Sequence, residues 1–380
     1  MGDTIEIKGT CDERFTAVKE AFAKNFEEGK EVGASFAATV DGKFVVDIWA
    51  GYADEAKSRL WEKDTIVNVY STTKVMTVIC ALMQVDRGLI DLDAPVADYW
   101  PEFAQAGKEK LPVRYLFSHS SGLSGFEKPI DTDTLYDWEE VTARLAAQAP
   151  WWKPGTKCGY HALTHGYLLG ELVRRVTGKS LGTFFKEEVA EPLGADFHIG
   201  LDEMHDPRVG ELIPPQLPSE PVFKPEPGSV LAKHAASITL NALESRTRAW
   251  RAAEIPAANG HGNARSVARI ASAMASGGEI DGIRLMSQAT IDKAIEEQIN
   301  DTDLILMIPV RYGLGFGLLS EWMPVGPNPR TFFWGGWGGS LCVMDLDARV
   351  SYSYVMNKMA NDTTGDLRAA VPGAALYACL

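Results

Sequence analysis

One stretch of the chain pairs a serine with a lysine at a spacing that suits nucleophilic catalysis. Ser71 and Lys74 stand at the start of a long apolar run that ends at Asp86–Gly88. A charged end followed by glycine is typical of a helix terminus, so the run predicts a buried helix that carries both side chains on one face. A lysine takes a serine proton only when its pKa is lowered, and burial among the apolar residues after Lys74 would lower it.

An isolated Ser-x-x-Lys also has a plainer interpretation. The serine can cap a core helix whose lysine extends to solvent. Lys74 is the only lysine in the chain with a serine three residues before it, which removes competing candidates without proving a role. Other stretches therefore have to decide between the two interpretations.

A tyrosine follows a glycine-punctuated loop and precedes a predicted helix. The loop spans residues 154–159, Tyr160 comes next, and helical spacing begins at Ala162. A tyrosine in such a place is usually packed with a satisfied hydroxyl. Its functional interpretation is a phenol beside Ser71 and Lys74 that shares the proton in general acid/base catalysis.

A second glycine-rich stretch, residues 332–340, contains Trp-Gly-Gly twice in tandem. Glycine tolerates close backbone approach, so a tightly packed sheet edge is one interpretation. An exposed edge also brings a ligand to backbone N–H groups, which can form an oxyanion hole. The two interpretations are compatible.

Two other patterns are interpreted as decoys. Gly178–Gly182 matches the Gly-x-Ser-x-Gly elbow, which must follow a strand, but here it follows a predicted helix, with Gly178 as C-cap and Ser180 capping the next helix. His161 and His165 are four residues apart without the glutamate of a zinc-protease helix. They are predicted to be loop and helix-surface histidines.

Composition limits the classes of protein. The length of 380 residues predicts about two domains or one large domain with an insertion, and a hydrophobic content of 46% is ample for a core. The net charge of −14 argues against a nucleic-acid or anionic-membrane surface and favours a small uncharged ligand. No signal sequence and no membrane-spanning apolar run are evident, which predicts a cytoplasmic protein. Five scattered cysteines predict free thiols rather than a disulfide framework or a zinc site.

Strand patterns lie at both ends of the chain and helical patterns lie between them. We predict an α/β domain from residues 1–75 and 280–380 and a mainly helical domain from residues 76–279, with a proline-rich segment at 207–228. Asp41-Gly42 predicts a type I′ hairpin. The other predicted helices are residues 12–30, 113–119, 134–149, 162–177 and 266–274, and the predicted strands are 33–40, 43–50, 312–318, 340–345 and 350–356.

Taken together, Ser71–Lys74, Tyr160–Ala162 and Trp334–Gly336 resemble the three motifs of the serine β-lactamase and penicillin-binding-protein superfamily. The resemblance is greatest to the class C β-lactamase-like branch and its family VIII carboxylesterases. Residues 116–123 and 277–287 also look like that branch. The resemblance implies a serine β-lactamase-like fold, in which an antiparallel sheet is flanked by helices.

The resemblance also implies an acyl-enzyme mechanism without metal or cofactor. Ser71 would attack a carbonyl while Lys74 and Tyr160 act as general base and acid. The oxyanion would bind the backbone N–H groups of Ser71 and Trp337, with Trp334, Gly335 and Gly336 forming the third motif. A motif that begins at Trp337 instead would move the second N–H to Ser340.

Two departures from the β-lactamase pattern guide the expected substrate. Trp334 replaces a lysine that faces the substrate carboxylate, and Ala162 replaces an asparagine that recognises its amide. We therefore expect a serine carboxylesterase for small or short-chain uncharged esters, with Trp151 and Trp152 as further apolar candidates. The alternatives are a weak β-lactamase or D-amino-acid peptidase, an acyltransferase, and a ligand-binding protein on the same fold. Neither a monomer nor a homo-oligomer is predicted over the other.

Overall fold

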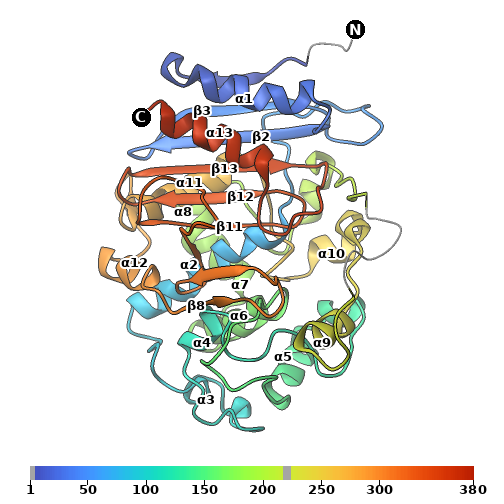
Figure 1. The fold of residues 1–380 in the computed structure, drawn as a ribbon, viewed down its shortest axis with the longest axis vertical. Coiled ribbons are helices and arrows are strands. Elements are labelled where there is room, and N and C mark those ends of the chain that lie inside the picture. The colour runs from blue at the N-terminus through green and yellow to red at the C-terminus, as the bar shows by residue number, and fades with distance from the viewer. Residues whose placement is uncertain (1–4, 217–223) are drawn as a thin grey trace.

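The computed structural model describes residues 5–216 and 224–380, and a single nine-stranded antiparallel sheet forms its largest element (Figure 1). The strand order is β1-β3-β2-β13-β12-β11-β10-β9-β8. The strands are β1 (Lys8–Cys11), β2 (Gly33–Val40), β3 (Lys43–Gly51), β8 (Ile299–Thr302), β9 (Pro309–Tyr312), β10 (Gly317–Leu318), β11 (Thr331–Gly335), β12 (Leu341–Asp345) and β13 (Val350–Met356).

The two ends of the chain meet in the middle of this sheet. β2 pairs with β13 from Ala34↔Met356 to Val40↔Val350, so a blue and a red strand lie side by side in Figure 1. Two small strand pairs lie outside the sheet: β4 (Val67–Asn68) with β5 (His261–Gly262), and β6 (Glu279–Ile280) with β7 (Ile283–Arg284). The expected antiparallel sheet from both chain ends is confirmed.

Helices cover both faces of the sheet. α1 (Thr16–Glu27) and α13 (Leu367–Ala378) pack against each other on one face, where Phe22 contacts the ring of Tyr354. α11 (Ala264–Ala275) lies against the other face, where the Ser351 hydroxyl donates to the carbonyl of Ala268. Because side chains alternate along a strand, β13 is buried on both faces, and all seven of its residues are buried.

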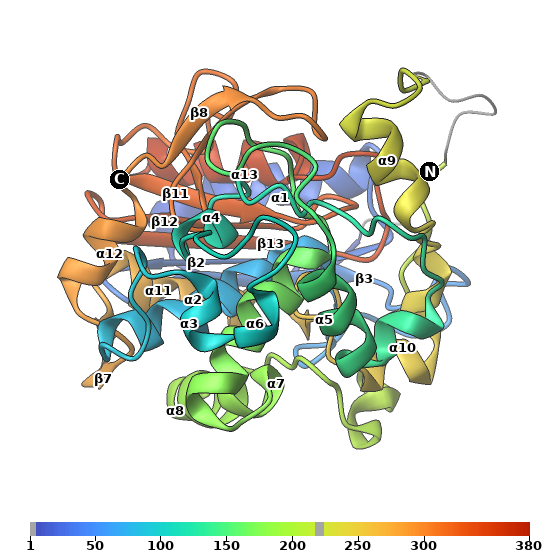
Figure 2. The same cartoon turned by 90° about the horizontal axis from the view of Figure 1, so that it is seen from below.

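The remaining helices lie on the α11 face of the sheet and at the end of the molecule opposite the N-terminus (Figures 1 and 2). They are α2 (Thr73–Asp86), α3 (Val96–Tyr99), α4 (Arg114–Phe117), α5 (Trp138–Ala147), α6 (Thr164–Thr177), α7 (Leu181–Phe185), α8 (Glu191–Leu193), α9 (Val230–Ser237), α10 (Arg248–Ala252) and α12 (Gln288–Ala294). α2 is the central one: it packs against α6 and α7, and its residues from Thr73 to Gln84 are all buried. A helix that is apolar over most of its surface must be enclosed in this way.

Most of the predicted elements are confirmed. Asp41 and Gly42 both adopt positive φ, at 48° and 75°, as a type I′ turn requires, and Gly178 ends α6 at a φ of 72°. The prediction of one strand over residues 312–318 was wrong, because the chain turns between β9 and β10. The predicted helix over residues 113–119 is shorter in the structure: α4 stops at Phe117, and His119 adopts a positive φ of 56°.

The domain division stays a prediction. α11 precedes the boundary drawn at residue 279 and nevertheless packs on the sheet. Of the proline-rich segment, residues 217–223 lie outside the described residues. Across 5–216 and 224–380, no helix has the length and apolarity that crossing a bilayer would require.

Candidate active site

Ser71 lies in a tight turn that leads directly into α2. Residues Tyr70–Thr72 form one 3₁₀ turn, and Tyr70 adopts a φ of 44°, a region that a non-glycine residue rarely occupies. The Tyr70 ring is held between Trp337 and Trp250, at centroid distances of 5.1 and 6.1 Å. Packing therefore maintains a strained backbone immediately before the candidate nucleophile, as is common at functional sites.

Lys74 is fully buried one turn after Ser71. Its Nζ lies 3.0 Å from Ser71 Oγ, 2.7 Å from the carbonyl oxygen of Ala162 and 3.0 Å from that of Ala257. Burial lowers the pKa of Lys74 well below its usual value. A neutral amine has two N–H groups and one lone pair, and these match two carbonyl oxygens and one hydroxyl.

Tyr160 approaches Ser71 from the other side. Its hydroxyl donates a hydrogen bond of 2.7 Å to Ser71 Oγ, and its ring centroid lies 4.7 Å from Lys74 Nζ. The rings of His119 and Trp334 pack against it at 5.1 and 5.3 Å. Burial raises the pKa of Tyr160 above that of a free phenol, so the hydroxyl keeps its proton at neutral pH.

The glycine-rich loop after β11 lies against the turn that carries Ser71. A Cβ on Gly336 would stand 2.2 Å from the carbonyl oxygen of Val69 and 3.2 Å from the backbone nitrogen of Ser71, so only glycine fits there. The Ser340 hydroxyl donates to Val69 O over 2.8 Å. Within residues 5–216 and 224–380, the backbone N–H groups of Ser71 and Trp337 donate no hydrogen bond, which leaves both available to an oxyanion.

The geometry distinguishes the two Trp-Gly-Gly motifs. Trp334 is buried beside Tyr160, and Gly336 faces the nucleophile turn. Gly339, which would take that place in the second motif, instead faces the side chains of Arg368 and Asp366. The third motif that contacts Ser71 is thus the one that begins at Trp334.

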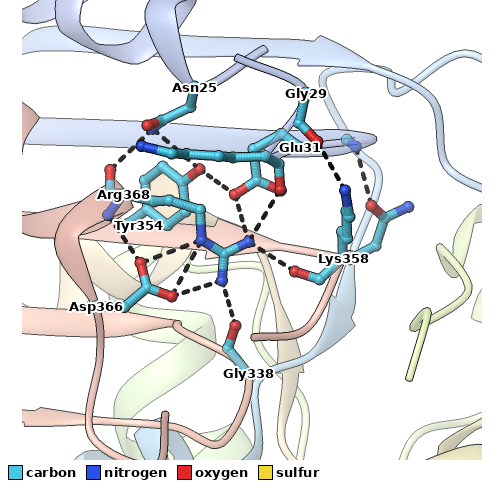
Figure 3. Close-up of polar contacts among 11 residues, drawn as sticks. Asn25, Gly29, Glu31, Gly338, Tyr354, Lys358, Asp366 and Arg368 are labelled. Carbon is cyan, nitrogen blue, oxygen red and sulfur yellow. Dashed lines mark hydrogen bonds and ion pairs between the residues drawn. The ribbon is translucent and has the colours of Figure 1, made fainter. Parts of the chain in front are cut away.

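A network of buried polar and charged side chains contacts this loop at Gly338 (Figure 3). Arg368 donates to the carbonyl oxygen of Gly338 and pairs with Asp366 at 2.6 Å and with Glu31 at 2.8 Å. The Tyr354 hydroxyl also donates to Glu31, whose pKa burial raises to about 8. Sequence reasoning missed this network, because no local pattern marks residues that are more than 300 positions apart in the chain.

A small cavity opens beside Ala162. Its volume is about 110 Å³, below the roughly 300–1,000 Å³ of sites for drug-sized ligands. The walls are Ser124, Gly125, Phe126, Ala162, Leu163, Thr164, His234, Ser237, Ile238 and Leu240. Burial lowers the pKa of His234, so no wall side chain carries a charge at neutral pH.

The Gly-x-Ser-x-Gly motif is a helix cap, as predicted. The Ser180 hydroxyl caps α7 by accepting from the N–H of Thr183 at 3.2 Å and donates to Glu254 at 2.6 Å. Gly178 ends the preceding helix. The motif therefore lacks the strand–turn–helix context of a nucleophile elbow.

The prediction that His161 and His165 lie on the surface was wrong, since both are fully buried. The hydrogen bonds of His161 join its Nδ1 to Gly159 O at 2.6 Å and its Nε2 to the hydroxyl of Ser121 at 2.7 Å. Burial lowers the pKa of His161 to about 3. A neutral imidazole whose two nitrogens are both hydrogen-bonded can be buried at little cost in free energy. The polarity of a histidine in the sequence does not show whether such partners exist.

The two adjacent tryptophans lie near the Tyr160 loop without contacting Ser71 in the described hydrogen-bond or ring contacts. Trp152 packs against Gly159 and places its ring 6.2 Å from that of His161. Trp151 donates through its indole nitrogen to Glu127. Their expected role as walls of the site stays a prediction.

Comparison with known proteins identifies the family. The Beta-lactamase family model matches residues 18–375. The esterase/beta-lactamase LipL of Mycobacterium tuberculosis is 37% identical over 374 residues, which covers 93% of this chain and 83% of LipL.

Two solved structures are similar over nearly their whole length. A family VIII carboxylesterase has a TM-score of 0.93 at 44% identity, covering 99% of this chain and 100% of that one. A penicillin-binding protein homologue from Caulobacter crescentus has a TM-score of 0.91 at 40% identity, with the same coverage. The resemblance inferred from the three motifs is thus confirmed, and the chain belongs to the beta-lactamase family of serine hydrolases.

Proposed function

We propose that this protein is a serine carboxylesterase that hydrolyses small or short-chain uncharged esters through an acyl-enzyme on Ser71. The observation that carries the proposal is the position of Ser71 Oγ, 3.0 Å from Lys74 Nζ and 2.7 Å from the Tyr160 hydroxyl. A nucleophile held between a base and an acid is the arrangement that covalent catalysis requires. The esterase names of LipL and of the family VIII structure support the same reaction class.

Acylation of Ser71 uses the neutral amine of Lys74 and the protonated phenol of Tyr160. Neutral Lys74 keeps its two N–H groups on the carbonyls of Ala162 and Ala257 and accepts the Ser71 proton through its lone pair. Ser71 Oγ then bonds to the ester carbonyl carbon, and the oxyanion binds the N–H groups of Ser71 and Trp337. Tyr160 donates its proton to the departing alkoxide and recovers one from the Lys74 ammonium.

Deacylation uses the same groups in reverse. Water takes the place of the departed alcohol, and Tyr160 together with Lys74 accepts its proton while the water oxygen attacks the acyl carbon. The acyl–Ser71 bond breaks, and the proton returns to Ser71 Oγ. The carboxylic acid and the free enzyme are the products.

The small cavity beside Ala162 and the side chain of Trp334 favour uncharged substrates. The cavity beside Ala162 is small and carries no charged side chain at neutral pH. Trp334 is buried where the β-lactamase pattern has a lysine, and Ala162 has no amide for a peptide-like side chain. A short acyl group therefore fits better than an anionic β-lactam, which needs a cationic partner.

Hydrolysis of p-nitrophenyl esters of increasing acyl length tests the proposal, with a chromogenic cephalosporin measured in parallel. We expect turnover of short esters, little cephalosporin cleavage, and loss of ester turnover in Ser71→Ala. Ser180→Ala is the matched control, because Ser180 sits in a serine motif but caps α7. Ester turnover that survives Ser71→Ala would refute the proposal, and preferred cephalosporin cleavage would favour the β-lactamase alternative.

A further inference from the structure

The carboxylate of Asp303 holds the backbone of Tyr160 from a distant part of the chain. Asp303 follows β8 and is fully buried. Its Oδ1 accepts from the N–H of Tyr160 at 3.0 Å and from those of Ile305 and Leu306, both at 2.8 Å. Its Oδ2 accepts from the hydroxyl of Tyr312 at 3.1 Å. One side chain thus joins its own turn to the Tyr160 loop and to β9.

The hydrogen-bond donors around Asp303 include more groups than its own turn supplies. Each hydrogen bond of its carboxylate among the described residues comes from a backbone N–H or a phenol. A carboxylate away from water is stabilised only by such donors, and hydrogen bonds to an ionised acceptor are about twice as strong as neutral ones. The local turn uses only the N–H groups of Ile305 and Leu306, so the bonds from Tyr160 and Tyr312 are additional.

The conformation of the Tyr160 loop depends on hydrogen bonds from its backbone N–H groups to residues outside the loop. Residues 158–161 belong to no helix or strand. Three successive N–H groups are instead held from outside: Gly159 donates to His119 O at 3.0 Å, Tyr160 donates to Asp303, and His161 donates to His119 Nδ1 at 3.2 Å. His119 thus accepts from the residues before and after Tyr160, and Asp303 accepts from Tyr160 itself.

We propose that Asp303, together with His119, is a positioning residue that sets the Tyr160 hydroxyl against Ser71. The inference rests on the proposed function, because Tyr160 is the acid/base group that it positions. The tyrosine ring is rigid, so a shift of its backbone by about 1 Å moves the hydroxyl out of the 2.7 Å bond to Ser71. Displacements of that size cost about 10²-fold in rate.

The charge of Asp303 also acts on the phenol. Burial, and after it the Asp303 carboxylate, raises the pKa of Tyr160. The other polar or titratable groups that face Tyr160 are Lys74 from α2, Ser71, His119 before the loop, Tyr312 from β9 and the indole of Trp334 from β11. An Asp303→Asn variant keeps an acceptor for the three N–H groups but removes the charge, so it should lower the pKa of Tyr160 while the backbone of the loop stays in place.

A matched control exists elsewhere in the sheet. Asp345 is equally buried, and its Oδ1 accepts from the N–H groups of its own turn at Asp347 and Ala348. Its Oδ2 accepts from the hydroxyl of Tyr377 at 2.9 Å. Asp345 pairs with Thr331, at the end of β11 away from Trp334. Asp345→Ala therefore removes a similar set of bonds without touching the Tyr160 loop.

The test measures the rate at which an alkyl phosphonate labels Ser71, followed by intact mass, beside kcat, KM and Tm. We expect Asp303→Ala to slow labelling and lower kcat by about 10–10²-fold, with KM nearly unchanged. Asp345→Ala should lower Tm without slowing the labelling of the folded enzyme. In a Tyr160→Phe background, Asp303→Ala should have little further effect on labelling, because it acts through Tyr160.

Equal labelling rates in Asp303→Ala and Asp345→Ala would overturn the proposal, as would a full additional effect in the Tyr160→Phe background. If Asp303→Ala does not fold, Asp303→Ser decides, because its shorter side chain loses the carboxylate oxygen that accepts from the Tyr160 N–H: a wild-type labelling rate would refute the positioning role. Failure of the wild type itself to label would refute the proposed function instead, so the two failures are distinguishable.

Discussion

At the residue scale, the proposed mechanism requires a neutral amine at Lys74 and a protonated phenol at Tyr160. Lys74 has no carboxylate among its hydrogen-bond partners, only two carbonyls and Ser71, so nothing offsets the cost of burying its charge. Tyr160 is buried in the same place, and its phenolate is disfavoured for the same reason. Burial thus shifts the pKa values of the base and the acid in opposite directions, and each shift favours the form that acylation needs.

Removal of either group should be costly. We expect Lys74→Ala or Tyr160→Phe to lower kcat by about 10²–10⁴-fold, the usual worth of general acid/base assistance. Steady-state kinetics on a p-nitrophenyl ester, with folding checked by circular dichroism, measures the effect. Near-full activity in either variant would refute the role assigned to that residue.

The pH dependence of kcat/KM should follow the protonation of the Lys74 amine. Its amine must be neutral to accept the Ser71 proton, and it is protonated below its pKa, so kcat/KM falls as pH falls through that pKa. Because burial lowers the pKa well below its ordinary value, which is about 10.4 in model peptides, we expect a plateau that extends through pH 8 and 9. A profile that still rises steeply at pH 10 would contradict a neutral base, provided that the protein stays folded across the range.

At the element scale, the candidate active site lies where the N-terminal end of α2 meets the C-terminal end of β11. The turn at Tyr70–Thr72 presents Ser71, and the loop after β11 closes on that turn through Gly336 and Ser340. Neither element forms an oxyanion site alone. Their contact places Gly336 against the backbone nitrogen of Ser71, next to Trp337, which carries the second proposed oxyanion donor.

Gly336→Ala tests this contact. The added Cβ would stand 2.2 Å from Val69 O, so the loop must move away from the nucleophile turn, and we expect kcat to fall by about 10²-fold. Gly29→Ala is the control: Gly29 has a φ of 68° and open space around it, so the variant should lose about 1–2 kcal/mol of stability and keep its kcat. Unchanged kcat in Gly336→Ala would remove the loop from the oxyanion site.

At the scale of the whole molecule, both ends of the chain support the catalytic loop. Arg368, at the start of α13, reaches Glu31 just before β2 and Gly338 in the loop (Figure 3). Its side chain is only 7% exposed, as against 51% for Arg349, which also pairs across the sheet with Asp41. Buried ion pairs and exposed ones differ strongly in what their disruption costs.

Arg368→Ala should therefore cost about 3–5 kcal/mol of unfolding free energy, because it leaves the Asp366 carboxylate buried without its partner and removes the hydrogen bonds to Glu31 and Gly338. Arg349→Ala should cost less than about 1 kcal/mol. Urea denaturation of both variants, with activity followed in parallel, checks the difference. Equal losses would show that the buried network does not anchor the loop.

The sequence by itself determined the local elements and the candidate residues for the chemistry. The hairpin at Asp41-Gly42, the end of α6 at Gly178 and the helix after Ser71 all depend on backbone preferences and periodicity within a few residues, which a sequence displays directly. The three motifs were recognised in the same way, and with them the family.

Only the tertiary structure decided how these residues are held. The burial of Lys74, and with it the lowered pKa, depends on distant parts of the chain at Ala162 and Ala257, whose carbonyl oxygens contact its Nζ. The burial of His161 could not be inferred from its polarity. Asp303 reaches Tyr160 across 143 positions of the chain, and Arg368 reaches Gly338 across 30. Such contacts arise when whole elements pack together, because packing in three dimensions joins residues that share no local pattern in the chain.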